Sequence, residues 1–359
     1  MQTLQTLWFI LVAFMLIVYV LLDGFDLGAG VIHLIAAKND DERHLIIEAI
    51  GPVWDGNEVW IIAAGGTLFF AFPLLYASSF SGFYLSLIMV LWLLIVRGVS
   101  IELRSRIPSH IWVTFWDGLF FIGSTLLSIF YGAALGNIIR GAPLDKTGYF
   151  FEALWTDFNP FSANPGILDW YTILIGLMAL TTLTLHGANY IAVKTEMELQ
   201  ARARRIARMA WAATVVLTVL GTLATFSVQP HILASFMARP WGAIFPLIGL
   251  AGLIGAIYFN VLQHDLPALF SSGAFILGML ASSAFGLYPY VLPAVNPANS
   301  LTIQNASASQ YGLIVGLVWW SIGMLLAIIY FIFAYRQFSG KIQTPGAKGY
   351  EQGPAVATS

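Results

Sequence analysis

Carboxylates stand inside apolar stretches of this 359-residue chain, and their type and spacing could do chemistry. Asp23 and Asp26 interrupt the first apolar stretch at a spacing of i, i+3, which places them on adjoining parts of one helix face. A charge at the centre of a bilayer costs about 2.5–3.5 kcal/mol even on insertion-based scales, so acids there need a reason. The pair predicts one shared polar cavity. The alternative is a helix break near the inner surface.

A denser acidic group follows around a proline. Glu48, Asp55 and Glu58 stand at i, i+7 and i+10, roughly one stripe of a helix. Pro52 removes a backbone donor within that stripe, so we expect a bend that opens a polar pocket. Carboxylates in such a pocket suit proton relay or cation binding, because a desolvated carboxylate can accept a proton and hold it. The alternative is a polar face that packs against a partner.

Arginines lie close to these acids in the sequence. Arg97 ends one apolar stretch, Glu102 follows it, and Asp117 opens the next. We expect Arg97 to pair with one of the acids named so far, because an unpaired guanidinium would be costly there. Arg104 and Arg106 are interpreted as marks of the cytoplasmic side.

Two histidines, His33 and His186, fall within apolar stretches, and either could be a haem ligand in principle. Membrane-embedded b-type haems usually need paired axial ligands, so hydrogen-bonded structural histidines are the favoured interpretation, and the chain offers no convincing haem ligand. The chain has no cysteine, which excludes disulfides, thiolate metal sites and cysteine nucleophiles.

The composition places these residues in a membrane. Hydrophobic residues make up 58% of the chain, its mean hydropathy is +0.80, and only 9% of its residues are charged. A water-soluble domain needs far more charge to cover its surface. Four runs contain no Asp, Glu, Lys, Arg or His and are long enough to cross a bilayer: 59–96, 118–139, 240–263 and 266–335. The net charge of −2 argues against nucleic acid as a partner.

Breaks at polar, proline-containing or charged turns divide the chain into nine candidate spans, near 5–35, 44–72, 79–100, 115–138, 168–193, 206–229, 240–262, 266–287 and 311–335. The basic residues test this division, because cytoplasmic loops carry the excess of Lys and Arg. All but three of the sixteen fall on one side, and the exceptions are Arg140, Lys146 and Arg239. The sequence therefore predicts an all-α polytopic membrane bundle with its N-terminus outside and its C-terminus cytoplasmic. Residues 1–336 would form a single transmembrane bundle, and 337–359 a disordered cytoplasmic tail.

Four short segments carry a resemblance to a known family. They are Leu-Asp-Gly-Phe-Asp-Leu-Gly at 22–28, Pro-Val-Trp-Asp-Gly-Asn-Glu-Val-Trp at 52–60, Phe-Ser-Gly-Phe-Tyr at 80–84 and Leu-His-Gly-Ala at 185–188. These segments closely resemble cytochrome bd ubiquinol oxidase subunit II, including its cyanide-insensitive variants. The Trp-Asp-Gly-Asn core is the most specific part.

The resemblance implies an activity and a set of partners. The chain would pair with a haem-bearing subunit I that carries low-spin haem b, high-spin haem b, haem d and the quinol-oxidising loop. The complex would oxidise quinol and reduce oxygen to water, taking its chemical protons from the cytoplasm. It would lie in the bacterial cytoplasmic (inner) membrane, with small accessory membrane subunits and a structural quinone as further components that some members hold.

The resemblance also implies roles for individual residues. It makes Asp55 a proton or cation site and therefore the candidate metal ligand of this chain. The other members of the proton pathway or cation site would be Asp26, Glu58, Arg97, Glu102 and Asp117, with supporting residues Asp23, Glu48, Trp54, Asn57, Trp60 and His186. Some family members have Asp in place of Glu102 and Lys in place of Arg106. The first difference keeps an acid, whereas the second removes a side chain that titrates easily.

Three hypotheses follow for the function of the chain. The first is a respiratory subunit of a quinol:oxygen oxidoreductase that supports its partner and delivers protons to it. The second is an ion- or proton-coupled secondary transporter, because broken helices with midplane carboxylates also hold ions in transporters. The third is a purely structural partner whose acids serve assembly.

Overall fold

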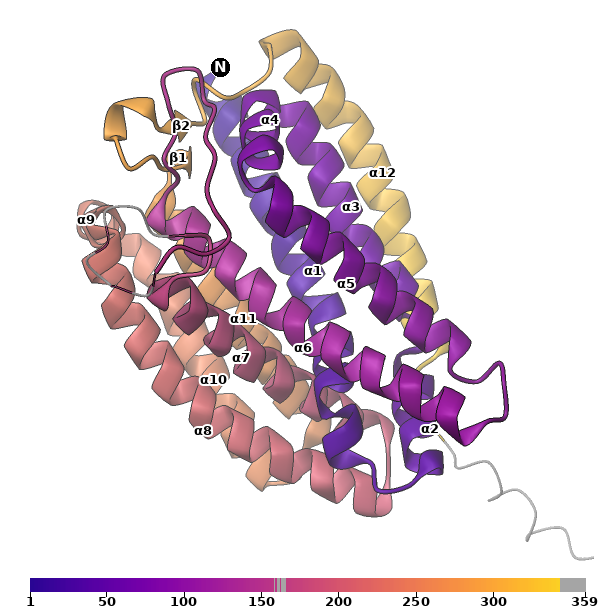
Figure 1. Ribbon diagram of the computed structural model, residues 1–359. Helices are drawn as coiled ribbons and strands as arrows, with labels where there is room; N and C mark the ends of the chain where they lie inside the picture. The colour runs from indigo at the N-terminus through magenta and orange to yellow at the C-terminus, as the bar shows by residue number, and fades with distance from the viewer. Residues whose placement is uncertain (158, 160–161, 163–165, 343–359) are drawn as a thin grey trace, which may run out of the picture.

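Long helices run side by side between two polar ends in the computed structural model, which describes residues 1–157, 159, 162 and 166–342 (Figure 1). The α-helices are α1 (Gln2–Ala36), α2 (Asp40–Ile50), α3 (Trp54–Ala71), α4 (Pro73–Gly82), α5 (Tyr84–Leu103), α6 (His110–Arg140), α7 (Trp170–Lys194), α8 (Met197–Val228), α9 (Pro230–Ala238), α10 (Ile244–Val261), α11 (Asp265–Leu287) and α12 (Gln310–Gln337). Two 3-10 turns, η1 (Pro240–Ala243) and η2 (Pro297–Asn299), and an antiparallel pair of short strands, β1 (Tyr290–Leu292) and β2 (Leu301–Thr302), complete the described elements.

Eight of the described helices are long and apolar enough to cross a membrane. A ninth span is counted when α3 and α4 are taken together, although the two are bent by 120° at their junction. Pro73 causes that junction, because it stands at the first position of α4 and cannot donate a bond to the turn before it. The prediction of an all-α polytopic bundle with about nine spans is confirmed. The tail from 343 onward lies outside the described residues.

The prediction of one continuous second span is corrected at Pro52. The residues around this proline form a turn, so that α2 ends at Ile50 and α3 begins at Trp54. Glu48 therefore lies on α2, where it is exposed, and it does not share a helix stripe with Asp55 and Glu58 on α3. A proline removes a hydrogen bond and clashes with the preceding turn, and here the result is a break rather than a bend.

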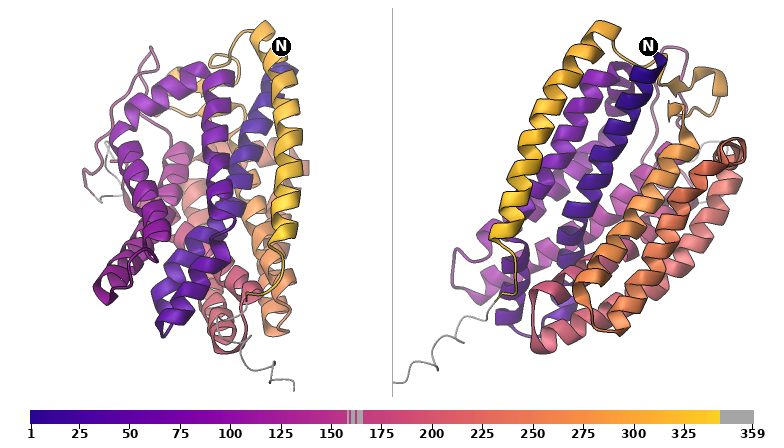
Figure 2. Two further views of the ribbon diagram at one scale, coloured as in Figure 1. Left: turned by 90° about the vertical axis from the view of Figure 1, so that its right-hand side faces the viewer. Right: turned by 180° about the vertical axis from the view of Figure 1, so that it is seen from behind.

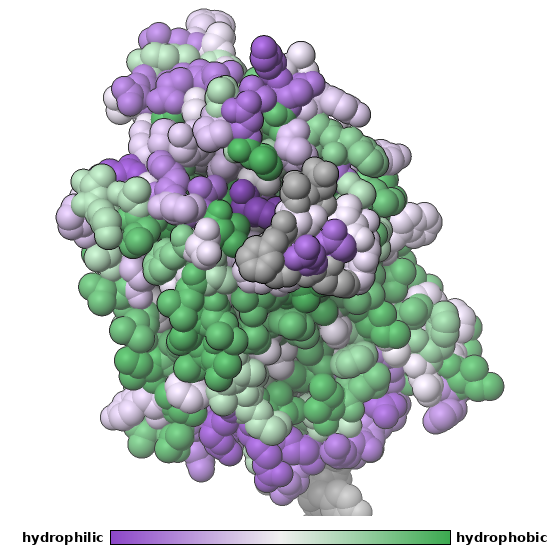
Figure 3. Space-filling model, turned by 60° about the vertical axis from the view of Figure 1, so that its left-hand side comes forward, coloured by the Kyte–Doolittle hydropathy of each residue, from purple (hydrophilic) through white to green (hydrophobic). Residues whose placement is uncertain are grey.

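The two ends of the bundle differ in charge. The turns after α1, α5 and α7 lie at the same end as α2, the start of α8 and the end of α12, and this end of the bundle has most of the basic residues (Figures 1 and 2). The N-terminus, α4, α9 and the β1–β2 pair lie at the other end (Figure 1). A hydrophobic belt separates the polar ends on the face shown in Figure 3. By the excess of basic residues, the α2 end is the inner end.

The first helix lies at the centre of the packing and contacts α3, α6, α7 and α11. Its closest approach is to α7, where Gly28 faces Gly187 and Leu183: a Cβ atom on either glycine would overlap the backbone of the other helix. Small residues allow this spacing between transmembrane helices. The contact holds the second half of α1, which contains Asp23 and Asp26, against α7.

Candidate functional site

Asp23 and Arg97 form a bidentate ion pair inside the bundle. Nη1 of Arg97 donates to Oδ2 of Asp23 over 2.9 Å, and Nη2 donates to Oδ1. Both side chains are fully buried. The expected pairing of Arg97 is thus confirmed, and its partner is the acid on α1. A buried pair of this geometry satisfies both charges, and the loss of one partner would leave the other uncompensated.

Two tyrosines extend this pair away from the inner end. The hydroxyl of Tyr19, one turn before Asp23, donates to its Oδ2 over 2.8 Å, and the hydroxyl of Tyr131 on α6 lies 2.7 Å from that of Tyr19. The two rings meet edge to face. Sequence analysis did not identify either tyrosine, although the i, i+4 spacing of Tyr19 and Asp23 was a usable signal.

Asp26 has a different environment from Asp23. Its Oδ2 accepts a hydrogen bond of 2.7 Å from the amide of Asn57 on α3, whose own Oδ1 accepts one of 2.8 Å from the hydroxyl of Tyr335 on α12. Oδ1 of Asp26 is buried and has no hydrogen-bond partner among the described residues. Asp23 and Asp26 thus share a buried polar region, as predicted, but only Asp23 has an arginine bonded to it.

The α3 residues of the predicted site lie between this region and the surface of the chain. Asn57 and Trp60 are buried, Glu58 and Trp54 are half-buried, and Asp55 is exposed. Trp60 contacts Phe331 of α12, with 5.5 Å between the ring centroids. Helix α3 therefore turns an amide towards Asp26 and acids towards the outside of the chain.

A second cluster lies at the inner end around Asp117. Oδ1 of this carboxylate lies 2.7 Å from Nε2 of His33 and accepts a bond of 2.5 Å from Nε of Arg104. Nη1 of Arg43 lies 3.4 Å from its Oδ2. Arg104 also bonds Asp40 at the start of α2. The interpretation of Arg104 as a simple mark of the inner side is corrected, because its side chain is only 3% exposed and pairs with Asp117.

Two of the predicted acids stand apart from both clusters. Glu102 is exposed at the end of α5, where its carboxylate lies 3.8 Å from Arg106. Glu48 is exposed on α2. Neither acid contacts the Asp23, Asp26 or Asp117 groups, so the described residues do not connect Glu102 to a contiguous polar system.

His186 packs as a structural histidine. Its Nε2 lies 3.0 Å from the carbonyl of Leu21 and its Nδ1 2.8 Å from the hydroxyl of Ser272. A carbonyl only accepts, so Nε2 carries the proton and Nδ1 is the acceptor. His33 has Nε2 bound to Asp117. Since both nitrogens of His186 are engaged, His186 does not fit axial ligation of a haem, whereas Nδ1 of His33 has no hydrogen-bond partner among the described residues.

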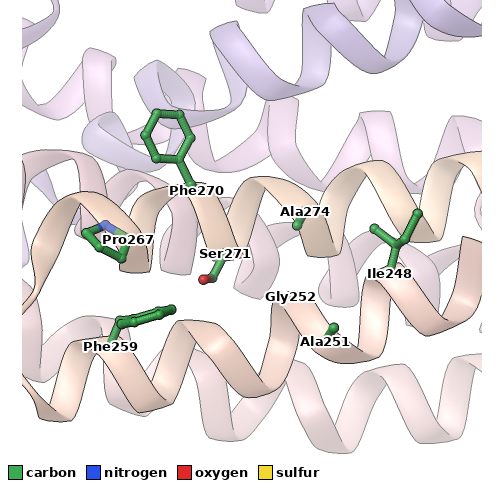
Figure 4. A pocket seen from close by; sticks show the side chains of 8 residues that line it. All are labelled: Ile248, Ala251, Gly252, Phe259, Pro267, Phe270, Ser271 and Ala274. Atoms are coloured by element: carbon green, nitrogen blue, oxygen red, sulfur yellow. The ribbon is translucent and has the colours of Figure 1, made fainter.

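No group of three or more His, Cys, Asp or Glu side chains within 1–157, 159, 162 and 166–342 is arranged to hold a metal ion. Asp55 could therefore contribute to a cation site only together with ligands from elsewhere. A shallow groove of about 440 Å³ lies between α10 and α11 (Figure 4), and its lining is apolar apart from Ser271: Ile248, Ala251, Gly252, Phe259, Pro267, Phe270, Ser271 and Ala274. The groove contains none of the predicted site residues.

The outer end holds a third buried cluster, which sequence analysis did not identify. Arg140 at the end of α6 pairs with Glu152 of the following loop and with Asp169, the N-cap of α7. Burial raises the pKa of Glu152 to about 7, against the attraction of Arg140 and with a further contribution from Asp169. Nearby, hydrogen bonds from Thr147 hold the pKa of the exposed Asp145 below its ordinary value.

Comparison with known proteins agrees with the resemblance of the short segments. The chain matches the family described as cytochrome bd terminal oxidase subunit II over residues 4–338. Cytochrome bd-I ubiquinol oxidase subunit 2 of Escherichia coli is 30% identical over 95% of this chain and 96% of that protein. Cytochrome bd ubiquinol oxidase subunit 2 of Bacillus subtilis is 31% identical over 87% of this chain and 89% of that protein.

A solved structure shows the same fold. A chain in the bd oxidase from Geobacillus thermodenitrificans aligns with a TM-score of 0.72 over 94% of this chain and 98% of that chain, at 16% identity. Together with the match over residues 4–338, this favours the respiratory-subunit hypothesis over the secondary transporter. The chain belongs to the cytochrome bd terminal oxidase subunit II family.

Proposed function

We propose that this chain, a multi-pass membrane subunit of a bacterial respiratory oxidase, delivers protons from the inner side to a haem-bearing subunit I and supports that subunit structurally. The complex would oxidise quinol, as the names of the relatives from Escherichia coli and Bacillus subtilis indicate for their complexes, and it would reduce oxygen to water. The haems would be held by subunit I, as the resemblance implies, and both ring nitrogens of His186 are engaged within this chain.

The contrast between Asp23 and Asp26 is the observation that carries this proposal. The bidentate bond to Arg97 occupies both carboxylate oxygens of Asp23. Asp26 is bonded only by a neutral amide and keeps one buried oxygen without a partner. A buried carboxylate in that setting can exchange a proton without breaking an ion pair. Asp26 is thus the proposed proton carrier, and Asp23 with Arg97 is the fixed support beside it.

Helix α3 supplies the route from Asp26 to the partner. Asn57 bonds Asp26, and on the same helix Glu58 is half-buried and Asp55 exposed. Acids left exposed on a membrane-spanning helix are costly in lipid, so this face of α3 is the proposed contact with subunit I. Asp55 would serve there as a proton or cation site completed by groups of the partner. Glu102, exposed on α5, would join the route in the same way.

Two further components stay predictions. A structural quinone bound to this chain would need an apolar channel for its isoprenoid tail, and the groove between α10 and α11 offers such a lining. Accessory membrane subunits would cover lipid-facing helices of the bundle.

The test is proton uptake by the purified two-subunit complex reconstituted in vesicles. Replacing Asp26→Asn keeps the side-chain volume and the contact with Asn57 but removes the exchangeable proton, and we expect uptake to slow by about a hundredfold. Asp55→Asn should also slow uptake while the haem spectra stay unchanged. Asp145→Asn, which alters an exposed acid of the outer loop, is the control. Normal oxygen consumption and proton uptake in both Asp26→Asn and Asp55→Asn would show that the chain does not deliver protons.

A further inference from the structure

His33 is a buried titratable side chain that the route proposed above does not use. Its Nε2 lies 2.7 Å from Oδ1 of Asp117, and since a carboxylate accepts, Nε2 is the donor. Its Nδ1 is buried and has no hydrogen-bond partner among the described residues. The carboxylate thus fixes the ring and its tautomer, and this leaves Nδ1 as a lone pair able to take up a proton. A carboxylate also holds the general-base histidine of hydrolase triads, where the roles of the two ring nitrogens are exchanged.

The charges around His33 balance before a proton arrives. Asp117 and Asp40 supply two negative charges, and Arg104 and Arg43 supply two positive ones. The cluster reaches solvent at the inner end, because the side chain of Asp40 is 65% exposed and that of Arg43 is 28% exposed. His33 itself is fully buried. His33 is therefore the most deeply buried side chain of this cluster, and Asp40 and Arg43 are its solvent-exposed members.

Three buried polar atoms without partners in the described part of the chain lie along one side of α1: two belong to α1 itself, at His33 and Asp26, and the third belongs to Ser124 of α6 between them. The residues at 26, 30 and 33 share one stripe of α1, within about 60° of arc. Gly30 lies opposite Ser124 of α6 so closely that a Cβ on Gly30 would overlap the Ser124 hydroxyl. The hydroxyl oxygen of Ser124, Oδ1 of Asp26 and Nδ1 of His33 are all buried without a partner among the described residues.

The distance along the stripe suits a short file of water. Seven residues of α-helix separate Asp26 from His33, which corresponds to about 10 Å along the axis. Ser124 stands opposite the intermediate position. Buried polar groups in proteins are nearly always hydrogen-bonded, and internal water bonds those that lack a protein partner. Two or three waters together with the Ser124 hydroxyl would reach from one end to the other at about 2.8 Å per hydrogen bond.

We propose that His33 is the inner-end proton acceptor of a water file that runs past Ser124 to Asp26. A hydrated proton at the inner end gives its proton to Nδ1 of His33, and the imidazolium returns it from Nδ1 to the next water of the file. The last water transfers a proton to Oδ1 of Asp26. Nε2–H stays bonded to Asp117 throughout, so the ring is reset when Nδ1 is deprotonated. This inference rests on the proposed function, since it names the entrance of the same proton route.

A purely structural role for His33, in which it only anchors Asp117, makes a different prediction. His33→Gln retains an amide donor for Asp117 but cannot take up a proton. If His33 is a proton acceptor, this variant should assemble with normal haem content, while proton uptake from the inner side slows by about tenfold. Its rate should also begin to fall at a lower pH than in the unaltered complex, because proton supply becomes limiting sooner. A structural role would not move that pH profile.

Ser124→Ala provides a second variant, which removes one oxygen and leaves the packing nearly unchanged. We expect proton uptake to slow severalfold. Ser128→Ala is its matched control on the same helix, because the Ser128 hydroxyl is buried but already bonded to the carbonyl of Ser124 over 2.8 Å. That variant should take up protons at the unaltered rate.

The measurements are proton uptake by the reconstituted two-subunit complex between pH 6 and 9, together with haem spectra, for His33→Gln, Ser124→Ala, Ser128→Ala and Asp26→Asn. Slow uptake in His33→Gln and Ser124→Ala with a normal Ser128→Ala supports the file. If His33→Gln and Ser124→Ala take up protons at the unaltered rate while Asp26→Asn takes them up slowly, protons enter by another path. Only this inference then fails. If Asp26→Asn is normal as well, the proposed function fails with it. Should His33→Gln not assemble, a normal rate in Ser124→Ala still overturns the file.

Discussion

Arg97 and Asp23 stand 74 residues apart in sequence and form a bidentate ion pair with both side chains fully buried. The pair fixes α5 to α1 beside the acid that lacks an arginine bonded to it. Two neighbouring carboxylates on one helix are thus equally buried but differ in what each one bonds.

Removing one partner of this pair should destabilise the complex strongly. Arg97→Gln leaves the Asp23 carboxylate buried and uncompensated, which costs about 3–5 kcal/mol. Asp23→Asn combined with Arg97→Gln should cost less than the two single changes added together, because neither charge is then left alone. Thermal unfolding of the detergent-solubilised complex measures both effects. Additive losses would show that the two side chains are not coupled.

The outer cluster should loosen as the pH rises. The pKa of Glu152 is about 7, above its ordinary value of 4.5, so its contribution to stability is complete below the ordinary value and is lost as the pH rises through about 7. The contribution of Glu152 to the free energy of unfolding should fall by an amount on the order of 1–3 kcal/mol over this pH range. Proteolysis of the 141–169 loop between pH 5 and 8.5 measures it.

Glu152→Gln should remove that pH dependence, because glutamine does not titrate. Asp145→Asn in the same loop is the control: the pKa of Asp145 is lowered by its bonds from Thr147, so its titration lies below this window. A loop equally resistant to protease at pH 5 and 8.5 in the unaltered protein would contradict the prediction.

The contact between α1 and α7 should not tolerate a methyl group. Gly187→Ala would place its Cβ against the backbone of Gly28, so we expect a loss of about 1–3 kcal/mol from overpacking. Gly65→Ala is the control, because an added Cβ there would meet nothing within 4 Å. A lower unfolding temperature for Gly187→Ala alone is the expected result, and equal temperatures for the two variants would refute the close contact.

Glu102 should matter to the complex but not to the stability of this subunit. Its side chain is 56% exposed and forms only a long surface pair with Arg106, and such pairs contribute little. Glu102→Gln should therefore leave the unfolding temperature unchanged, and any effect should appear as slower turnover with subunit I bound. An unaltered turnover would place Glu102 outside the proton route.

The helical membrane bundle could be predicted from the sequence because the features that indicate it are local. Apolar runs and the side on which basic residues fall can be read without knowing which helices touch, and both survive the breaks at Pro52 and Pro73. The polar contacts are different, since Asp117 meets a histidine 84 residues away and Asp26 an asparagine 31 residues away. That Arg97 needs an acid follows from electrostatics. Which acid it bonds depends on packing between helices.

The site residues that could not be predicted are of types that are common in membrane helices and at their ends. Tyr19, Tyr131 and Tyr335 look like membrane aromatics, and only their hydroxyl bonds distinguish them. Arg104 stands among residues that usually mark the inner side, yet the partners on α2 and α6 bury it. The stripe of Glu48, Asp55 and Glu58 was wrong because helical periodicity does not continue through a proline turn.

The hydrogen bond from Tyr335 to Asn57 has a consequence for biosynthesis. Tyr335 lies near the end of α12, which is synthesised after the other described helices, whereas Asp26 lies on α1. Until α12 inserts, Oδ1 of Asn57 lacks this donor, and the amide that bonds Asp26 is free to turn its oxygen towards the carboxylate instead. The hydrogen-bonded group around Asp26 is therefore complete only after α12 has been inserted beside α3.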